Sequence, residues 1–205
     1  MKTILVQMIG VVVFTLGTMI LGHRIRRASR RTEAQRASRI SHLLFWGCLL
    51  GPGLIGLVHP GLRHYDELLG FPSFPLRPLA FALGLLVLLP GIGLMIASNR
   101  ALSRFGRGSA AFFLTEDVVV RGVYLRTRNP MSLGFYMACV GVGMLAGSSA
   151  VTLGALFVIT PVHLFNLKYF EERELELRFG QPYRDYRSHT PFLLPRFIRG
   201  REARG

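Results

Sequence analysis

Four long stretches of this chain contain no aspartate, glutamate, lysine or arginine. They cover residues 3–23, 40–62, 78–99 and 129–167, and so run for 21, 23, 22 and 39 residues. A helix needs about 20 predominantly apolar residues to cross the hydrocarbon core of a bilayer. The sequence therefore predicts an all-α integral membrane protein, whose first three spans lie at about 3–23, 40–62 and 78–99.

The fourth stretch is long enough for two spans. Gly147-Ser148-Ser149 lies near its middle, and glycine and serine favour turns. We therefore expect a helical hairpin of 130–147 and 150–167, which makes five transmembrane helices in a single membrane domain, 1–205. The first stretch is longer than the roughly 7–15 apolar residues of a signal peptide, and only Lys2 precedes it, so we interpret it as a retained span.

The distribution of basic residues predicts an orientation. The chain has a formal net charge of +14, although half of its residues are hydrophobic. Seven basic residues lie in 24–39, six in 100–128 and nine from Lys168 onward, against one before the first span and two in 59–77. Five spans place the three rich segments on one side. Since basic loops stay cytoplasmic, we expect the N-terminus outside and the C-terminus in the cytoplasm, across the cytoplasmic membrane if the cell is prokaryotic.

The same charges need no nucleic acid to explain them, because arginines beside a membrane can contact anionic lipid headgroups. Cys48 and Cys139 both fall inside expected spans, and we interpret them as small packing residues rather than a disulfide or metal pair. The six histidines have no ligand spacing, and the sequence contains no P-loop, HExxH or nucleophile-elbow motif. We therefore expect no metal site.

Polar residues lie at the cytoplasmic ends of both hairpin helices. The stretch RTRNPMSLG, Arg126–Gly134, stands at the head of the first, where Pro130 suits the first turn of a helix. The second helix should continue to Gly180, a natural C-terminal stop. Glu171 and Glu172 then lie within about a turn of the membrane boundary, where an uncompensated carboxylate is expensive and usually functional.

The rest of this last helix is typical of a solvated, charged surface. Lys168 and Glu172, and likewise Glu174 and Arg178, are i,i+4 pairs of opposite charge. We expect the solvated interpretation to hold for Glu174 and Glu176, which lie farther from the membrane.

Four blocks, in order, resemble the membrane methyltransferases that include isoprenylcysteine carboxyl methyltransferase and phosphatidylethanolamine (phospholipid) N-methyltransferase. They are GVY at 122–124, RNPMSLG at 128–134, the Glu171-Glu172 pair, and FGQPYRDYRSHTPFLLP at 179–195. The second block is similar to Arg-His-Pro-x-Tyr-x-Gly of the isoprenylcysteine branch and to Asn-Pro-Met-Tyr-x-Gly of the phospholipid branch. The resemblance covers residues 110–196, the expected cofactor-binding half.

The resemblance implies a methyltransferase that uses S-adenosyl-L-methionine. The expected acceptor is lipophilic or small and reached from the lipid bilayer: a prenylcysteine-like carboxylate, a lipid amine or a thiol. Cofactor contacts are implied for Tyr124, Arg128, Asn129, Pro130, Gly134, Glu171 and Glu172, and catalytic roles for Arg128 and Glu172. Carboxylates can hold the cofactor's amino group or ribose, and an arginine its carboxylate. A polar cofactor arrives from the cytoplasm and the acceptor from the bilayer, so we expect the site at the inner membrane boundary.

Gly91-Ile92-Gly93 resembles a Gly-x-Gly that the phospholipid branch uses for the cofactor, although small residues in membrane helices more often serve close packing. Two positions depart from the family pattern. Asn129 replaces the histidine of the isoprenylcysteine branch and cannot act as a base near neutral pH. Ser132 replaces the motif tyrosine of both branches, so a ring contact is lost.

Two other interpretations stay open. One is an NADPH-dependent membrane reductase of the sterol C14 type, whose C-terminal half resembles this family but lacks the glutamate pair at that place. The other is a non-catalytic membrane protein with the same fold.

The orientation can be tested with reporter fusions. A reporter fused after Gly205 should be cytoplasmic, and one at the N-terminus should lie outside, because 22 basic residues are expected on one side and three on the other. Reporters on the same side would mean that the number of spans is not five.

Overall fold

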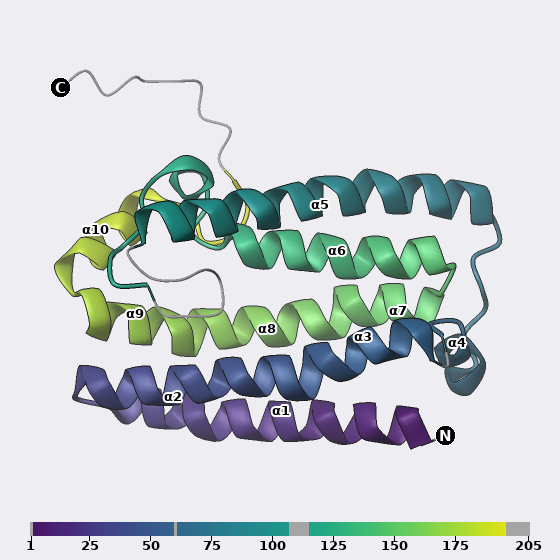
Figure 1. The fold of residues 1–205 in the computed structure, drawn as a ribbon, viewed down its shortest axis with the longest axis horizontal. Coiled ribbons are helices and arrows are strands. Elements are labelled where there is room, and N and C mark those ends of the chain that lie inside the picture. The colour runs from purple at the N-terminus through teal and green to yellow at the C-terminus, as the bar shows by residue number, and fades with distance from the viewer. Residues whose placement is uncertain (1, 60, 107–114, 196–205) are drawn as a thin grey trace.

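A computed structural model describes residues 2–59, 61–106 and 115–195 (Figure 1). The two ends of the expected cofactor-binding half, 110–114 and 196, lie outside the described residues. The elements in chain order are α1 (Lys2–Arg27), α2 (Arg31–Leu44), η1 (Phe45–Leu50), α3 (Gly51–Val58), α4 (His64–Leu69), α5 (Arg77–Phe105), η2 (Gly122–Leu125), α6 (Pro130–Ala146), α7 (Ser149–Gly154), η3 (Ala155–Ile159), α8 (Thr160–Asn166), η4 (Leu167–Glu171), α9 (Glu172–Phe179) and α10 (Gln181–His189).

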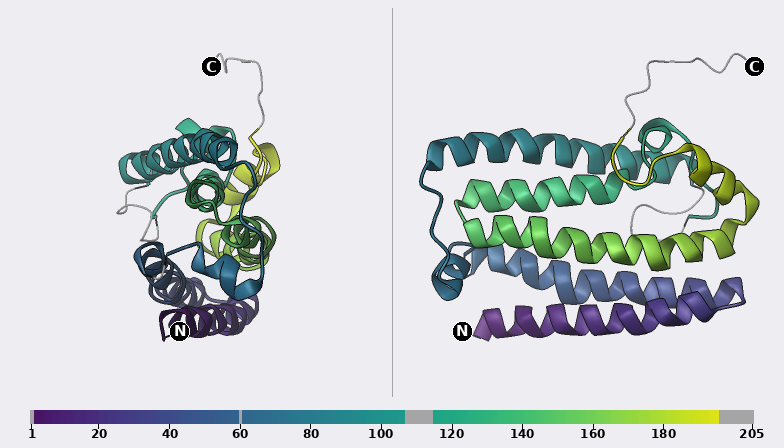
Figure 2. Two further views of the ribbon diagram at one scale, coloured as in Figure 1. Left: turned by 90° about the vertical axis from the view of Figure 1, so that its right-hand side faces the viewer. Right: turned by 180° about the vertical axis from the view of Figure 1, so that it is seen from behind.

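The elements form a bundle in which the chain runs along the long axis five times. α2, η1 and α3 make one continuous helix, and so do α7 through α9, because η1, η3 and η4 are π-helical turns within longer helices. Figures 1 and 2 show α1 beside α2 at one edge, α5 beside α6 at the other, and the α7–α9 helix between the two pairs. The described residues contain helices, turns and irregular segments but no strand, which confirms the all-α prediction for this part of the chain.

Four helices in the described residues are long and apolar enough to cross a membrane: Leu5–Arg27, Arg31–Val58, Arg77–Phe105 and Ser149–Phe179. α6 is also apolar but is shorter, with 17 residues. The five expected spans therefore correspond to four candidate spans and one shorter helix, and the number of crossings stays a prediction. The spans at 3–23 and 150–167 are longer than expected, and the helix expected at 40–62 begins at Arg31 and ends at Val58, since arginine is a good helix former.

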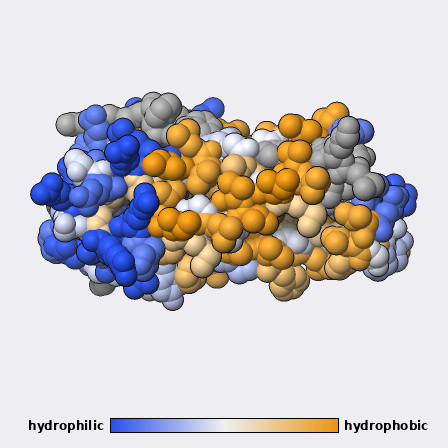
Figure 3. Space-filling view, turned by 90° about the horizontal axis from the view of Figure 1, so that it is seen from below, coloured by the Kyte–Doolittle hydropathy of each residue, from blue (hydrophilic) through white to orange (hydrophobic). Residues whose placement is uncertain are grey.

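The fold brings the described parts of the three basic segments to one end of the bundle. The α1–α2 connection, the C-terminal end of α5 and the α9–α10 region lie together on the left of Figure 1, whereas the N-terminus and α4 lie on the right. Figure 3 shows hydrophilic residues gathered at that left end and an apolar band over the middle of the molecule. Leu86, Leu89 and Phe157 are among the exposed apolar side chains. Their exposure suits a surrounding of lipid.

Glycines set the contact between α5 and α6. Gly84 and Gly91 on α5 face Gly141 and Gly134 on α6 at the same spacing of seven residues, which keeps one seam along both helices. A Cβ added at Gly91 would lie 2.9 Å from the carbonyl oxygen of Gly134, and one added at Gly134 would lie 2.6 Å from that of Gly91. The backbones therefore touch directly, as in other close membrane helix pairs.

The hairpin turn forms where the sequence predicts it. Gly147 ends α6 with a φ of 71°, and the side chain of Ser148 accepts a hydrogen bond from Val151 N at the start of α7. Asp66 on α4 also accepts hydrogen bonds from the start of α7: from Ser148 Oγ, Ser149 Oγ and Ala150 N. The carboxylate thus satisfies buried N–H and O–H donors at the first turn of α7 and ties α4 to the hairpin.

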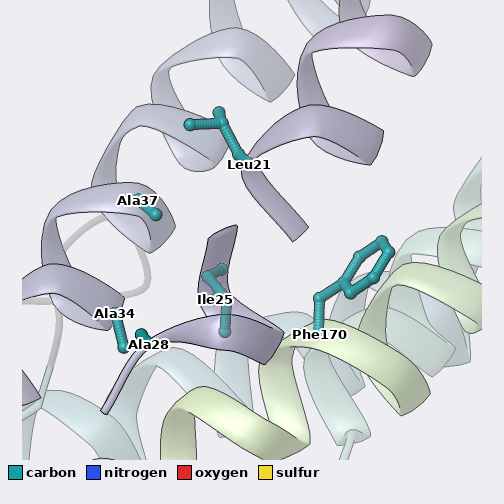
Figure 4. Close-up of a cluster of buried hydrophobic side chains, with 6 residues drawn as sticks. All are labelled: Leu21, Ile25, Ala28, Ala34, Ala37 and Phe170. Atoms are coloured by element: carbon teal, nitrogen blue, oxygen red, sulfur yellow. The ribbon is translucent and has the colours of Figure 1, made fainter. Parts of the chain in front are cut away.

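A cluster of buried side chains joins the α1–α2 pair to the last long helix. Figure 4 shows Leu21, Ile25, Ala28, Ala34 and Ala37 with Phe170 of η4. Gly22 leaves the space for the aromatic ring, since a Cβ there would lie 2.2 Å from a carbon of Phe170. The cluster fixes the distance between α1 and the helix that carries Glu171 and Glu172.

Gly91 and Gly93 provide a matched test of the glycine seam. Gly91→Ala should destabilise the protein by about 1–3 kcal/mol, because the new methyl group overlaps backbone atoms of α6. Gly93→Ala meets nothing within 4 Å and should be neutral or stabilising by up to about 1 kcal/mol. Unfolding in detergent measures both changes. Equal stabilities would contradict the seam.

Candidate functional site

A cavity of about 350 Å³ lies at the basic end of the bundle and extends toward the middle. Its wall is formed by α1, α2 and η1 on one side, α5 and α6 on another, and the helix from α8 to α9 on the third, with α10 and the segment before α6 at the polar end. Figure 2 shows these elements around the interior of the bundle from two directions. The cavity therefore joins a charged end to an apolar end.

The charged end is centred on an ion pair between the segment before α6 and the last long helix. Arg128 Nη1 lies 2.7 Å from Glu172 Oε1, and both side chains are only 7% exposed. Lys168 Nζ, one turn earlier on the same helix as Glu172, lies 3.2 Å from Glu172 Oε2. The structure thus brings together the two residues for which the resemblance implied catalytic roles.

Arg128 has one buried donor that the ion pair does not use. Its Nη1 atom faces Glu172 Oε1, whereas its Nε atom has no hydrogen-bond partner among the described residues. Buried polar atoms are normally satisfied, so this Nε atom indicates a place for a polar ligand. A guanidinium N–H group suits a carboxylate.

Glu171 lines the same cavity and is partly buried. In the described part of the chain it forms no ion pair and no side-chain hydrogen bond. An unpaired carboxylate beside a polar cavity suits a cationic group such as an ammonium. The two glutamates therefore differ: Glu172 is held by two cations, whereas Glu171 has no ion-pair partner among the described residues.

The C-terminal segment fastens the start of α6. The backbone N–H of Arg128 donates to Pro191 O at 2.9 Å, and Asn129 Nδ2 donates to Phe192 O at 2.9 Å. The guanidinium carbon of Arg128 lies 5.6 Å from the centre of the Phe192 ring, and Lys168 Nζ lies 4.9 Å from the same centre. Phe192 therefore packs under both cations that flank Glu172, at cation–π distance.

Tyr124 lines the cavity, and Tyr186 of α10 donates a hydrogen bond from its hydroxyl to Tyr124 O at 2.7 Å. Burial raises the pKa of Tyr124, of Tyr183 and of Tyr186 above that of a free phenol. The three phenols are therefore neutral at physiological pH and supply hydrogen bonds rather than charge.

The other residues implied by the resemblance lie in different places. Asn129 lines the cavity. Pro130 is the first residue of α6, as expected, but is fully buried and is not part of the cavity wall. Gly134 faces α5 at Gly91, outside the wall, so its position is accounted for by helix packing.

Glu174 is buried, so the expectation that it is solvated is wrong. Its side chain is 1% exposed, lines the cavity and pairs with Arg178 Nε at 3.3 Å. Arg178 in turn donates to Thr115 O at 3.3 Å. Glu174 faces inward because α9 continues the long helix into the contact with α2. Glu176 is also less solvated than expected, since it pairs with Arg173 and Arg187 and is 18% exposed.

Aromatic side chains line the apolar end of the cavity, and sequence analysis did not single them out. Phe45, Trp46 and Phe135 line it together with Phe14 and His163. The His163 ring stacks on that of Phe45, with centres 5.6 Å apart, and its Nδ1 lies 2.8 Å from the hydroxyl of Tyr136. His163 inside an apolar stretch could have pointed to this part of the cavity, because polar residues within membrane helices usually face the bundle interior.

The buried Glu174–Arg178 pair can be tested against the more exposed Glu176. Glu174→Gln should destabilise the protein by roughly 3–5 kcal/mol, because it leaves the Arg178 charge buried and unpaired. Glu176→Gln should cost less than about 1 kcal/mol. Denaturant titration of the detergent-solubilised protein measures both. In Glu174→Gln/Arg178→Met, much of the stability should return, and similar effects of the two single changes would refute the buried pair.

Comparisons with known proteins identify the family. A model of the phospholipid methyltransferase family matches residues 79–182, which is 104 of the 205 residues. Methanethiol S-methyltransferase 2 of Bradyrhizobium diazoefficiens is 33% identical over 83 residues, which are 40% of this chain and 30% of that protein. The aligned part thus spans less than a third of that relative, and no solved structure matches. Since the family match runs from α5 into α10 and covers just over half of the sequence, the chain belongs to the phospholipid methyltransferase family.

Proposed function

We propose that this protein is a membrane methyltransferase that transfers the methyl group of S-adenosylmethionine to an acceptor reached from the bilayer. The observation that carries this proposal is the cavity itself, which has buried charged side chains at the basic end, among them Arg128 with an unpartnered Nε in the described residues, and aromatic side chains at the apolar end. A zwitterionic methyl donor suits the first end and a lipophilic acceptor the second. Family membership supports the same activity.

The residues of the charged end fit such a donor. Arg128 offers its Nε–H to a carboxylate, and Glu171, which has no ion-pair partner among the described residues, offers a carboxylate to an ammonium group. Tyr124 and Asn129 complete this part of the wall with neutral polar groups. The bound donor would supply an activated methyl group on a positively charged sulfur, and Lys168 and Phe192 would hold Glu172 and Arg128 in place around it.

The protein's own contribution to catalysis is positioning and the exclusion of water. The transfer needs the acceptor atom in line with the methyl group, so fixed side chains around both reactants lower the barrier. Aromatic rings at the apolar end keep water away from the acceptor. We propose the cytoplasmic face of the membrane for the polar end, because the described parts of the basic segments gather there (Figure 1).

Three acceptor groups remain within this proposal: a prenylcysteine-like carboxylate, a lipid amine and a thiol. The relative from Bradyrhizobium diazoefficiens is named for a thiol acceptor, methanethiol, which supports the third. The replacement of the family tyrosine by Ser132 leaves a small side chain in the cavity wall.

Ligand binding tests the donor. S-adenosylhomocysteine, the demethylated donor, should raise the melting temperature of the purified protein, because a ligand that binds only the native state stabilises it. NADPH should leave the melting temperature unchanged. A shift with NADPH and none with S-adenosylhomocysteine would favour a reductase instead.

Three substitutions locate the binding site in the same assay. Glu171→Gln and Arg128→Met should each weaken S-adenosylhomocysteine binding about tenfold or more, since a charge-assisted hydrogen bond contributes roughly 1.5–3 kcal/mol. Glu33→Gln removes an exposed carboxylate of α2 at the same end of the bundle and should bind like the wild type. Calorimetry on folded protein gives the three affinities, and equal values would place the donor elsewhere.

A further inference from the structure

His163 is the polar group of the aromatic end that is fixed from more than one helix. Its ring stacks on Phe45 of η1 and meets Phe135 of α6 edge-on, with centres 6.2 Å apart. Tyr136, also on α6, holds Nδ1 at 2.8 Å and is itself buried. The ring orientation is therefore set by two neighbouring elements, as is usual for a histidine that presents its second nitrogen to a ligand.

The second ring nitrogen of His163, Nε2, can contact a ligand in the cavity. His163 lines the cavity, and its Nε2 has no hydrogen-bond partner in the described part of the chain. When Nδ1 carries the hydrogen, the ring donates to the phenol oxygen of Tyr136 and Nε2 keeps its lone pair. An imidazole among aromatic rings is neutral before the transfer, because a second positive charge beside the donor's positive sulfur is unfavourable.

The charged groups of the cavity lie some distance away. Glu171 follows His163 by eight residues on the same helix, which corresponds to a rise of about 12 Å. His42 of α2, whose Nδ1 donates to Ser38 O at 2.9 Å, is the other histidine of the wall. Tyr136 is the titratable group in direct contact with the ring. Within the part of the chain that the structure describes, the apolar end thus has a neutral proton acceptor but no side chain that could serve as counter-ion for a charged acceptor.

We propose, on the basis of the function proposed above, that the acceptor is a neutral thiol and that His163 Nε2 takes its proton. Among the described residues no lysine or arginine lies beside the ring to hold a carboxylate acceptor, and an ammonium would enter charged and unable to attack. Both cost free energy in an apolar site. A thiol enters uncharged, and its S–H can donate to Nε2.

The step balances. The acceptor sulfur forms a bond to the methyl carbon while the bond between that carbon and the donor's positive sulfur breaks. The electron pair of the broken bond stays on the donor sulfur, which becomes a neutral thioether. The thiol proton moves to Nε2, so the positive charge passes from the donor sulfur to the imidazole, and the products are S-adenosylhomocysteine and a methyl thioether.

The test compares two thiols of different acidity with purified full-length protein and S-adenosylmethionine. 1-Hexanethiol keeps its proton at neutral pH, whereas thiophenol is largely ionised and needs no base. His163→Gln should lower kcat/KM for 1-hexanethiol by about a hundredfold and should affect thiophenol far less, because general-base catalysis contributes roughly 10²–10⁴-fold. His42→Gln should leave the ratio between the two thiols unchanged.

A binding measurement gives a second readout. In the complex with S-adenosylhomocysteine, 1-hexanethiol should raise the melting temperature of the wild type more than that of His163→Gln, since only the wild type accepts the S–H hydrogen bond. Hexyl methyl sulfide has no S–H and should give equal shifts. If His163→Gln does not fold, Tyr136→Phe, which removes the partner that fixes the tautomer, should change the thiol ratio in the same direction by a smaller factor.

Several results would overturn the inference. They are equal losses for both thiols, a changed thiol ratio in His42→Gln instead of His163→Gln, and methylation of amines or carboxylates but of neither thiol. A wild-type protein that fails to bind S-adenosylhomocysteine would instead refute the proposed function, so the two failures are distinguishable.

Discussion

Arg128 and Glu172 hold opposite charges 2.7 Å apart, with both side chains almost removed from water. Two charges in such a place are tolerated only when further contacts compensate them, because desolvation can exceed the attraction between them. Here the compensation comes from several segments: Lys168 beside Glu172, the Phe192 ring under both cations, and Pro191 O bonded to the backbone of Arg128. The pair therefore joins the start of α6, the last long helix and the C-terminal segment. The cavity lies beside it.

The parts of the structure that depend only on local sequence could be predicted. Uncharged stretches gave the helices, Gly147 and Ser148 gave the hairpin turn, and Gly180 gave the end of α9 with a φ of 63°. These features depend on local composition and backbone conformation alone. The basic segment 24–39 was expected to connect two spans, because it is rich in charge. Most of it is helical, since arginine is found in helices as well as in loops.

The parts that depend on which side of a helix faces inward could not be predicted. Glu174 looked like a solvated residue with an i,i+4 partner, yet α2 covers it, and only the packing of α2 on α9 decides that. Gly134 belongs to a block that resembles a cofactor motif, yet a side chain at this position would clash with the carbonyl oxygen of Gly91. In both cases a tertiary neighbour distant in sequence determines the role, and the residue's own type is compatible with either role.

The π-helical turn η4 explains why one helix can line both ends of the cavity. Eight residues of regular α-helix rotate by about 80° beyond two full turns, so an uninterrupted helix would point His163 and Glu171 to different sides. A π-turn adds one residue without adding a full step of rotation, which reduces the difference to roughly 20°. η4, Leu167–Glu171, lies between these two residues and ends at the glutamate. The inserted turn thus aligns the aromatic end of the wall with the charged end, and this alignment lets a single helix contact both a polar donor and an apolar acceptor.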